Sequence, residues 1–256
     1  MKALVLAAGY ATRLRPLTDE TAKSLLPIAG RPMLDYVCDR IDEVEDVDEL
    51  HVVSNALFAG SFARWAETRA GRLCPLVHDD GTSSNEQRLG AIADLRYVVE
   101  QADLEGEDLL VVAGDNLFDF SLQEQVEFWR SRSSLVEGGR ASCVAVHRCR
   151  NSELLSLYGI VELGENGRIL NFVEKPERPA TDLIATASYV FAGEHVALID
   201  RYLAEGNSPD QPGNLLAWLY SREPVYGFVF EEFWLDIGDH EQLRAADELL
   251  RGRLGL

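Results

Sequence analysis

Short apolar runs alternate with segments of helical periodicity along most of this chain, and no other feature of the sequence restricts its fold as strongly. The runs at residues 2–8, 50–54, 109–113, 143–147, 187–191 and 225–230 are typical of buried strands. Apolar residues at helical spacing predict helices that begin after Pro32, near Asn85, at Leu122, at Val196 and at His240. Strands that alternate with helices are typical of a mostly parallel sheet with helices on both faces.

Local signals refine this outline at two places. Residues 159–163 and 168–174 flank Gly-Glu-Asn-Gly, which favours a tight turn, so we expect an antiparallel hairpin and therefore a mixed sheet. Ser84 and Gln87 have the spacing of a capping box, which predicts a helix from about Asn85 to Glu100. The chain has no internal repeat and no clear linker, and we expect one domain over residues 1–256.

The sequence is strongly acidic, and this excludes several classes of protein. It has 24 Lys and Arg against 43 Asp and Glu, a formal net charge of −19, so we expect no general binding to nucleic acid or to an anionic membrane. No apolar stretch approaches the roughly 20 residues that span a bilayer. The first apolar run is interpreted as a buried strand and not as a signal peptide. The four scattered cysteines are typical of free thiols, so we expect a cytoplasmic protein.

The few basic residues are unevenly distributed. Only Lys2, Lys23 and Lys175 are lysines, while the other 21 basic residues are arginines. Residues 1–32 carry a local charge of +3, although the remaining residues carry −22. The acidity therefore belongs to the rest of the chain, and the N-terminal segment is able to attract phosphate groups.

Small residues follow the first predicted strand and lead to a threonine and an arginine. The sequence Leu6-Ala-Ala-Gly-Tyr-Ala-Thr-Arg-Leu14 lets backbone N–H groups approach an anion, and Arg13 adds charge-assisted hydrogen bonds to phosphate. Ligands of open α/β sheets bind beyond the carboxyl ends of strands, where this segment lies. Neither a Walker loop nor the G-x-G-x-x-G fingerprint is present. The alternative is a surface turn with a solvated arginine.

Two aspartates are candidates for a metal site. Asp115 follows the apolar strand at 109–113, where a carboxylate can hold Mg²⁺, an ion that often bridges to substrate phosphates. Asp236 lies in an aromatic and aliphatic setting that is unusual for a carboxylate without a partner. Lys23 can supply a second cation beside Arg13. The alternatives are a turn or capping aspartate at 115 and a solvent-exposed lysine at 23.

Taken in order, these segments resemble the sugar-1-phosphate nucleotidyltransferases, also known as NDP-sugar pyrophosphorylases. The family opening L-A-G/A-G-x-G-T-R-L-x-P-L-T is matched by residues 6–18, and its P-K-x-L-L-P segment by residues 22–27. Further matches are Gly114-Asp-Asn116, Tyr158-Gly159, Glu174-Lys-Pro176 and Trp234-Leu-Asp-Ile-Gly238, so the similarity covers nearly the whole chain. The resemblance is greatest to the glucose-1-phosphate thymidylyltransferases and uridylyltransferases.

The resemblance implies a three-layer, Rossmann-like α/β fold of the nucleotide-diphospho-sugar transferase type, with a mixed, mostly parallel sheet. A nucleotide-binding half would span about 1–130 and a sugar-binding half about 140–256. It implies an enzyme that uses Mg²⁺, in which a sugar-1-phosphate oxygen attacks the α-phosphorus of a nucleoside triphosphate and gives an NDP-sugar and pyrophosphate. Such chemistry needs mainly positioning and charge neutralisation. Glucose-1-phosphate with dTTP or UTP is the pair that we expect.

The resemblance also assigns roles to individual residues. Catalysis falls to Arg13, Lys23, Asp115 and Asp236, of which the two aspartates hold Mg²⁺. The nucleotide is bound by Ala8, Gly9, Ala11, Thr12, Arg13, Lys23, Asn85 and Gly90. The sugar phosphate is bound by Asn116, Gly159, Glu174 and Lys175.

Two positions depart from the family pattern. Ala11 stands where the family usually has glycine, and its methyl group fits if the residue keeps a negative φ. Asn85 stands five residues before Gly90, where many members have a glutamine that contacts the base, and asparagine is one methylene shorter. We expect a pyrimidine base, and the alternative is that Asn85 only starts its helix.

Other functions remain open. Transfer of a cytidylyl group to a non-sugar phosphate such as phosphocholine is the alternative within the enzyme class. A catalytically inactive, ligand-sensing homologue is less favoured, because Arg13, Lys23, Asp115 and Asp236 are all present. The sequence lacks the hexapeptide repeats of a left-handed β-helix, so we expect no attached acetyltransferase domain, and it leaves a homo-oligomer open.

Overall fold

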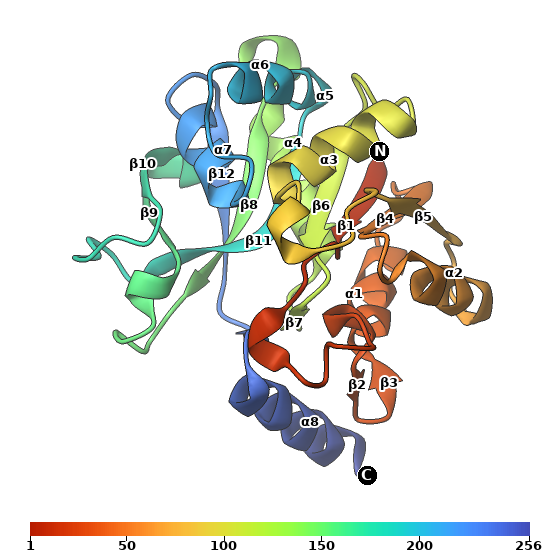
Figure 1. Ribbon diagram of the computed structural model, residues 1–256. Coiled ribbons are helices and arrows are strands. Elements are labelled where there is room, and N and C mark those ends of the chain that lie inside the picture. Colours follow the sequence, from red (N-terminus) through yellow and green to blue (C-terminus); the bar gives the residue numbers. More distant parts are fainter.

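The computed structural model describes all 256 residues, and its centre is a nine-stranded mixed sheet (Figure 1). The parallel half contains, in spatial order, β5 (Pro75–Asp79), β4 (Glu49–Ser54), β1 (Lys2–Leu6) and β6 (Leu109–Ala113). Strand β1 pairs on both sides, and Ala3, Leu4 and Val5 are fully buried. Central strands that are covered on both faces are apolar throughout, and for this reason the run is recognisable in the sequence.

An antiparallel region joins this half at β6. Strand β11 (Leu183–Phe191) pairs antiparallel with β6, with β8 (Ser142–Arg148) and with β9 (Gly159–Leu163). Strand β10 (Ile169–Val173) completes the predicted hairpin with β9, and β12 (Val225–Phe230) pairs in parallel with β8. The sheet is therefore mixed, as the sequence predicts.

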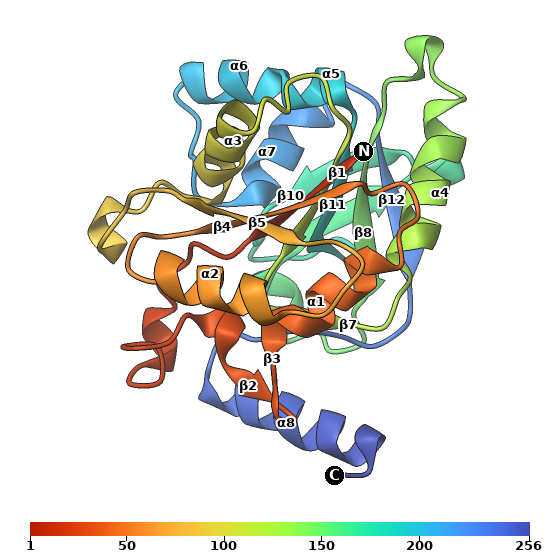
Figure 2. The same cartoon turned by 90° about the vertical axis from the view of Figure 1, so that its right-hand side faces the viewer.

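Helices cover both faces of the sheet and give three layers (Figure 2). On one face, α1 (Met33–Asp42), α2 (Ala59–Thr68) and α4 (Leu122–Ser133) contribute to a cluster of 27 buried apolar residues. On the other, α3 (Ala91–Gln101), α6 (Leu198–Ala204) and α7 (Pro212–Leu219) contribute to a cluster of 25, next to the short α5 (Gly193–Val196). The burial of apolar surface in these two clusters is the main source of stability. No helix has both the length and the hydropathy that a membrane crossing requires.

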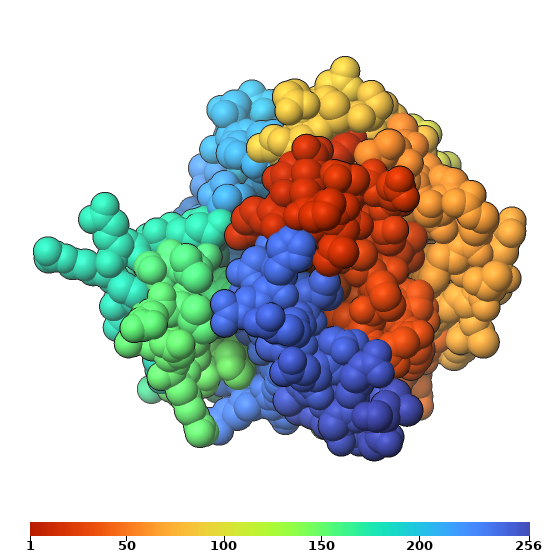
Figure 3. Space-filling model, turned by 60° about the horizontal axis from the view of Figure 1, so that its bottom comes forward, coloured from red at the N-terminus to blue at the C-terminus, as the bar shows by residue number.

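The last helix, α8 (His240–Leu254), packs on the N-terminal part of the chain, and Figure 3 shows its blue atoms beside the red ones of that part. Its Asp247 accepts a hydrogen bond from the N–H of Ala29 (2.7 Å), and Ala246 shares a small core with Ile28. Two small sheets, β2 (Pro27–Ile28) with β3 (Arg31–Pro32) and β7 (Asn116–Phe118) with β13 (Trp234–Asp236), complete the structure. The helix thereby supports the segment that carries Arg13 and Lys23.

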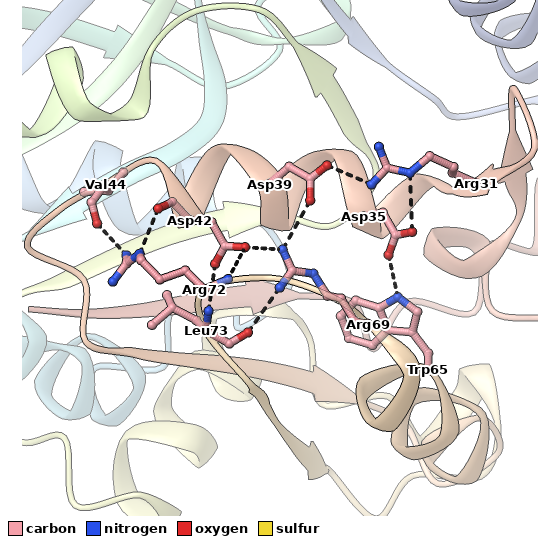
Figure 4. A network of polar contacts seen from close by, with 9 residues as sticks. All are labelled: Arg31, Asp35, Asp39, Asp42, Val44, Trp65, Arg69, Arg72 and Leu73. Atoms are coloured by element: carbon pink, nitrogen blue, oxygen red, sulfur yellow. Dashed lines mark hydrogen bonds and ion pairs between the residues drawn. The ribbon is translucent and has the colours of Figure 1, made fainter.

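A polar network holds α1 against the connection from α2 to β5 (Figure 4). Asp42, the last residue of α1, accepts hydrogen bonds from the Arg69 guanidinium (2.6 Å) and from the N–H groups of Arg72 and Leu73 (both 3.1 Å). Arg72 in turn donates to the carbonyl oxygen of Val44 (2.7 Å). The Arg69 side chain is only 2% exposed, so this network neutralises a buried charge.

The structure corrects the predicted start of one helix. Residues 85–87 form only a 3₁₀ turn, and α3 begins at Ala91, directly after Gly90, whose φ is +95°. The N–H groups of Ala91 and Ile92 donate to the carbonyl oxygens of Asp210 (3.3 Å) and Pro209 (2.8 Å). These partners lie far along the chain, so a local capping pattern gives no information about them.

Candidate active site

A cleft of about 400 Å³ opens at the carboxyl ends of β1 and β6, which is where open α/β sheets bind ligands. Nine of the residues predicted from the sequence line it: Ala8, Gly9, Gly90, Asp115, Asn116, Gly159, Glu174, Lys175 and Asp236. Five others lie outside its lining: Ala11, Thr12, Arg13, Lys23 and Asn85. Of these, Lys23 contacts a residue of the cleft directly.

The two candidate metal-binding carboxylates are brought together by the small sheet of β7 and β13. Asp236 lies opposite Asn116 in this sheet, and the N–H of Ile237 donates to the carbonyl oxygen of Asp115 (3.2 Å). Burial raises the pKa of Asp236 to about 6, and the negative charge of Asp115 adds to this shift. Residues 121 positions apart in the sequence thus form one acidic pair.

A lysine and an amide hold the first of these carboxylates. The Lys23 ammonium lies 2.7 Å from Asp115 Oδ2, and the Lys23 side chain is only 13% exposed. Asn116 Nδ2 donates to Asp115 Oδ1 (2.9 Å), and Asn116 Oδ1 accepts from the indole N–H of Trp234 (2.8 Å). The amide of Asn116 is therefore engaged on both sides by the protein, and its contact to a sugar hydroxyl stays a prediction.

The donor set of this acidic pair suits Mg²⁺. Two carboxylates offer hard oxygen ligands, and Mg²⁺ in phosphate-processing sites is commonly held by one or two carboxylates together with substrate phosphates. No group of three or more His, Cys, Asp or Glu side chains gathers anywhere in the protein as a metal cage. The residues present therefore fit a cation that completes its coordination with phosphate oxygens and water.

The loop after β1 contributes Ala8 and Gly9 to the lining of the cleft. Apart from Gly9 itself and its two chain neighbours, no residue has an atom within 4 Å of the place where a Cβ of Gly9 would be, so this backbone is open to a ligand. Ala11 has a φ of +44°, which contradicts the negative φ required for an easy fit of its methyl group. Arg13 follows in a 3₁₀ turn, with its guanidinium against Gly238.

The opposite wall carries Glu174 and Lys175. The Lys175 ammonium lies 3.7 Å from Glu174 Oε1, and burial raises the pKa of Glu174. With its amide turned to satisfy both neighbours, Gln211 donates to Glu174 (3.1 Å) and accepts from Lys175 (3.1 Å). Glu174 also abuts Gly159 and Gly213, where any side chain would collide with its carboxylate. The two glycines therefore make room for this acidic group.

The sequence analysis missed four polar residues of the cleft: Arg88, Asp94, Asp210 and Gln211. A signal existed for Asp94, since it stands three residues after Ala91 and four before Val98 and therefore lies on the buried face of its helix. No comparable pattern marks the other three, because their place in the cleft follows from the contact between α3 and the segment that precedes α7.

Comparisons with known proteins agree with this geometry. Residues 2–252 match the sequence profile of the family described as Nucleotidyl transferase. The chain belongs to this family. It is therefore a member of an enzyme family, as the sequence predicts.

Three curated relatives illustrate the range of this family. The chain is 24% identical over 254 residues to the bifunctional protein GlmU of Methanocaldococcus jannaschii (99% of this chain, 55% of that protein). It is 28% identical over 246 residues to the UTP–glucose-1-phosphate uridylyltransferase of Synechocystis sp. (93% and 60%). It is 26% identical over 243 residues to the mannose-1-phosphate guanyltransferase beta-B of Xenopus laevis (93% and 61%). The chain thus spans little more than half of the length of these relatives.

Solved structures share the fold. Crystal structures of UDP-glucose pyrophosphorylase, in the apo form and complexed with UDP-glucose, superpose with TM-scores of 0.77 and 0.78 at 20% sequence identity. The alignments cover 99% of both chains for the apo form and 98% of both for the complex. This likeness confirms the predicted fold class.

Proposed function

We propose that this protein transfers a nucleotidyl group from a nucleoside triphosphate to a sugar-1-phosphate, in a reaction that depends on Mg²⁺ and releases pyrophosphate. One observation carries the proposal: Asp115, Asp236 and Lys23 meet at the carboxyl ends of the parallel strands, in a cleft that also contains Glu174 and Lys175. Membership of the nucleotidyl transferase family supports the same class of reaction.

The reaction exchanges one phosphorus–oxygen bond for another. An oxygen of the sugar-1-phosphate bonds to the α-phosphorus, and the bond from that phosphorus to the oxygen bridging to the β-phosphate breaks. The electron pair leaves with pyrophosphate, where negative charge accumulates. No covalent intermediate with the protein is required, so the task of the site is positioning and charge neutralisation.

Residues on the wall formed by β1, β6 and β13 would bind the triphosphate. Asp115 and Asp236 would hold the cation, and Asn116 keeps the carboxylate of Asp115 in place. A bound Mg²⁺ supplies positive charge to the phosphate oxygens. The Lys23 ammonium lies beside the carboxylate of Asp115. Together with Arg13 it would stabilise the α-phosphate and the departing pyrophosphate.

Residues on the opposite wall would bind the sugar phosphate. The Lys175 ammonium pairs with its phosphate, while Glu174 accepts hydrogen bonds from sugar hydroxyls. We propose glucose-1-phosphate with dTTP or UTP as the substrate pair. The names of the relatives include both uridylyl and guanyl transfer, so GTP belongs in the same test.

The test is a pyrophosphate-release assay across a matrix of nucleoside triphosphates and phosphate acceptors. The triphosphates are dTTP, UTP, CTP, GTP and ATP, and the acceptors are common sugar-1-phosphates together with phosphocholine. We expect turnover with a sugar-1-phosphate and its loss when EDTA replaces Mg²⁺. Turnover with phosphocholine and CTP alone would favour the cytidylyltransferase alternative. Nucleotide binding without turnover for any pair would favour the inactive homologue.

Matched variants test the assigned roles. Lys23→Ala and Asp115→Asn should each lower kcat by about 100-fold or more, because each removes charge stabilisation at the reacting phosphates. Lys2→Ala and Asp182→Asn are the controls, since both residues form ion pairs away from the cleft, with Glu49 and Arg148 respectively. Near-wild-type activity of Lys23→Ala or Asp115→Asn would refute the corresponding role.

A further inference from the structure

A glutamine amide connects the two charged groups in the sugar-phosphate wall of the cleft, and the roles proposed above do not include it. Gln211 lines the cleft between Glu174 and Lys175. Its side-chain nitrogen lies 3.1 Å from Glu174 Oε1, and its side-chain oxygen lies 3.1 Å from Lys175 Nζ. The opposite orientation of the amide would place oxygen against carboxylate and NH₂ against ammonium, so hydrogen bonding selects this one. Gln211 therefore donates to one charged group and accepts from the other.

The two charged groups that the amide joins do not form a close ion pair with each other. Lys175 Nζ lies 3.7 Å from Glu174 Oε1, whereas a charge-assisted N–H···O hydrogen bond spans about 2.7–2.9 Å. The side chain of Lys175 is 47% exposed and that of Glu174 is 20% exposed, so both can be reached from the cleft. The amide thus satisfies both charges in part and keeps them apart.

The carboxylate and the amide have little freedom to move, whereas the ammonium has much more. Glu174 rests against the two glycines described above. Gln211 is the residue before α7, where its carbonyl oxygen accepts from the N–H of Asn214 (2.9 Å) and the following Pro212 restricts its backbone. Lys175 carries its ammonium on a flexible four-carbon chain. Loss of the amide would therefore let the ammonium close the gap to the carboxylate.

We propose that Gln211 is a positioning residue that holds the Lys175 ammonium away from Glu174 and so keeps both charges available to the sugar-1-phosphate. This inference rests on the proposed function, in which the ammonium pairs with the phosphate and the carboxylate accepts from sugar hydroxyls. Without the amide the two charges satisfy each other, and the sugar phosphate has to break their ion pair before it binds. The affinity for this substrate then falls, while binding of the triphosphate on the other wall is unchanged.

Gln211→Met tests the proposal, because methionine has nearly the same length but donates no hydrogen bond and is only a weak acceptor. With the preferred substrate pair, KM for the sugar-1-phosphate should rise about tenfold, while kcat and KM for the triphosphate change by less than about twofold. Gln123→Met on α4, outside the cleft lining, is the matched control and should change none of these values. A folded Gln211→Met protein with an unchanged KM for the sugar-1-phosphate would overturn the proposal.

A double-mutant cycle distinguishes positioning from direct contact with the substrate. In a Lys175→Met protein there is no ammonium to hold, so adding Gln211→Met should lower kcat/KM for the sugar-1-phosphate by less than about twofold, against about tenfold in the wild type. Gln211→Ala, which removes the amide without filling its place, should give the same pattern. If the losses from the two positions instead multiply, Gln211 contacts the sugar phosphate itself and the positioning role is wrong.

The spacing of the charges can also be measured without turnover. A crystal structure of the Gln211→Met protein should show the Lys175 ammonium within about 3 Å of the Glu174 carboxylate. A separation that stays near 3.7 Å would also overturn the proposal. If the wild-type protein turns over no substrate pair, the proposed function fails, and the structure of the variant still decides whether Gln211 keeps the two charges apart.

Discussion

Replacement of Asp42 by alanine should destabilise the protein more than any other single change in the polar network of α1. The substitution removes the acceptor of three hydrogen bonds, from the Arg69 guanidinium (2.6 Å) and from the N–H groups of Arg72 and Leu73 (both 3.1 Å). Arg69 would keep contacts to Asp39 (3.3 Å) and to the Leu73 carbonyl oxygen (3.1 Å) only.

The magnitude follows from burial. The Arg69 side chain is 2% exposed and that of Asp42 is 14% exposed, so the change leaves a buried charge without its main partner. Removing one partner of a buried ion pair costs about 3–5 kcal/mol of unfolding free energy. For a chain of this size that corresponds to a fall in Tm of roughly 6–20 °C. The total unfolding free energy of a native protein is only about 5–15 kcal/mol, so this loss is a large fraction of it.

Urea unfolding followed by circular dichroism measures the loss, and Asp39→Ala is the matched control. Asp39 lies one turn earlier on the same helix, and its side chain is 42% exposed, so its removal should cost less than about 1 kcal/mol. The double variant Asp42→Ala with Arg69→Met should recover part of the loss, because it removes the unpaired charge. A loss for Asp42→Ala that equals the loss for Asp39→Ala would refute the reasoning.

Three further predictions concern the loop after β1, Asp94 and the thiols. Ala11→Gly should change the unfolding free energy by less than about 1 kcal/mol, because relief of the strain at φ +44° offsets the greater freedom of glycine in the unfolded chain. Ala11→Val should lose about 1–2 kcal/mol in the same urea titration, and equal stability of the two variants would contradict this account. Asp94 has a folded-state pKa of about 8 against an ordinary value of 3.8, so the folded protein binds the extra proton between these limits. Its contribution to the unfolding free energy is complete below about pH 4 and is lost as the pH rises to about 8, by up to about 1.4 kcal/mol per pH unit. Asp94→Asn should therefore make the unfolding free energy depend less steeply on pH over this range. An unchanged slope in the variant would exclude Asp94 as its source. Of the four cysteines only Cys74 is exposed, and burial raises the pKa of Cys38 to about 12, so one thiol per native chain should react rapidly with Ellman's reagent. Rapid reaction of two or more would show that the core is more open than the structure indicates.

Most strands of the central sheet were predictable, because a strand that is buried on both faces consists of consecutive apolar residues. The run at 109–113 is β6, and the turn sequence Gly-Glu-Asn-Gly joins β9 and β10 as expected. The structure adds α2, α7 and β5, which the sequence analysis did not predict. The capping-box pattern at Ser84 failed because the N–H groups that open α3 find their partners in the carbonyl groups of Pro209 and Asp210. Partners that only the tertiary fold supplies leave no local signal.

The candidate site likewise contains some features that have a local signal in the sequence and others that depend on the tertiary fold. Small residues after β1 and the aspartate after β6 could be placed at one sheet edge from topology alone. The pairing of Asp115 with Lys23 and the engagement of the Asn116 amide by Trp234 depend on side-chain packing and appear only in the structure. The roles assigned to the site residues, the Mg²⁺ requirement, the cytoplasmic location and any homo-oligomer stay predictions.

The position of β1 at the centre of the parallel half has a consequence for the order of events on the ribosome. This strand precedes both of its neighbours, which begin at Glu49 and Leu109, so its second edge cannot be paired until more than 100 further residues have been synthesised. The other edge of β6 then stays unpaired until β11, which begins at Leu183, has been synthesised. Strand β6 is wholly apolar, with the sequence Leu-Leu-Val-Val-Ala. Unpaired apolar edges promote aggregation, so the growing chain is most vulnerable between these two points. Helper proteins that shield nascent chains would be needed most during that interval.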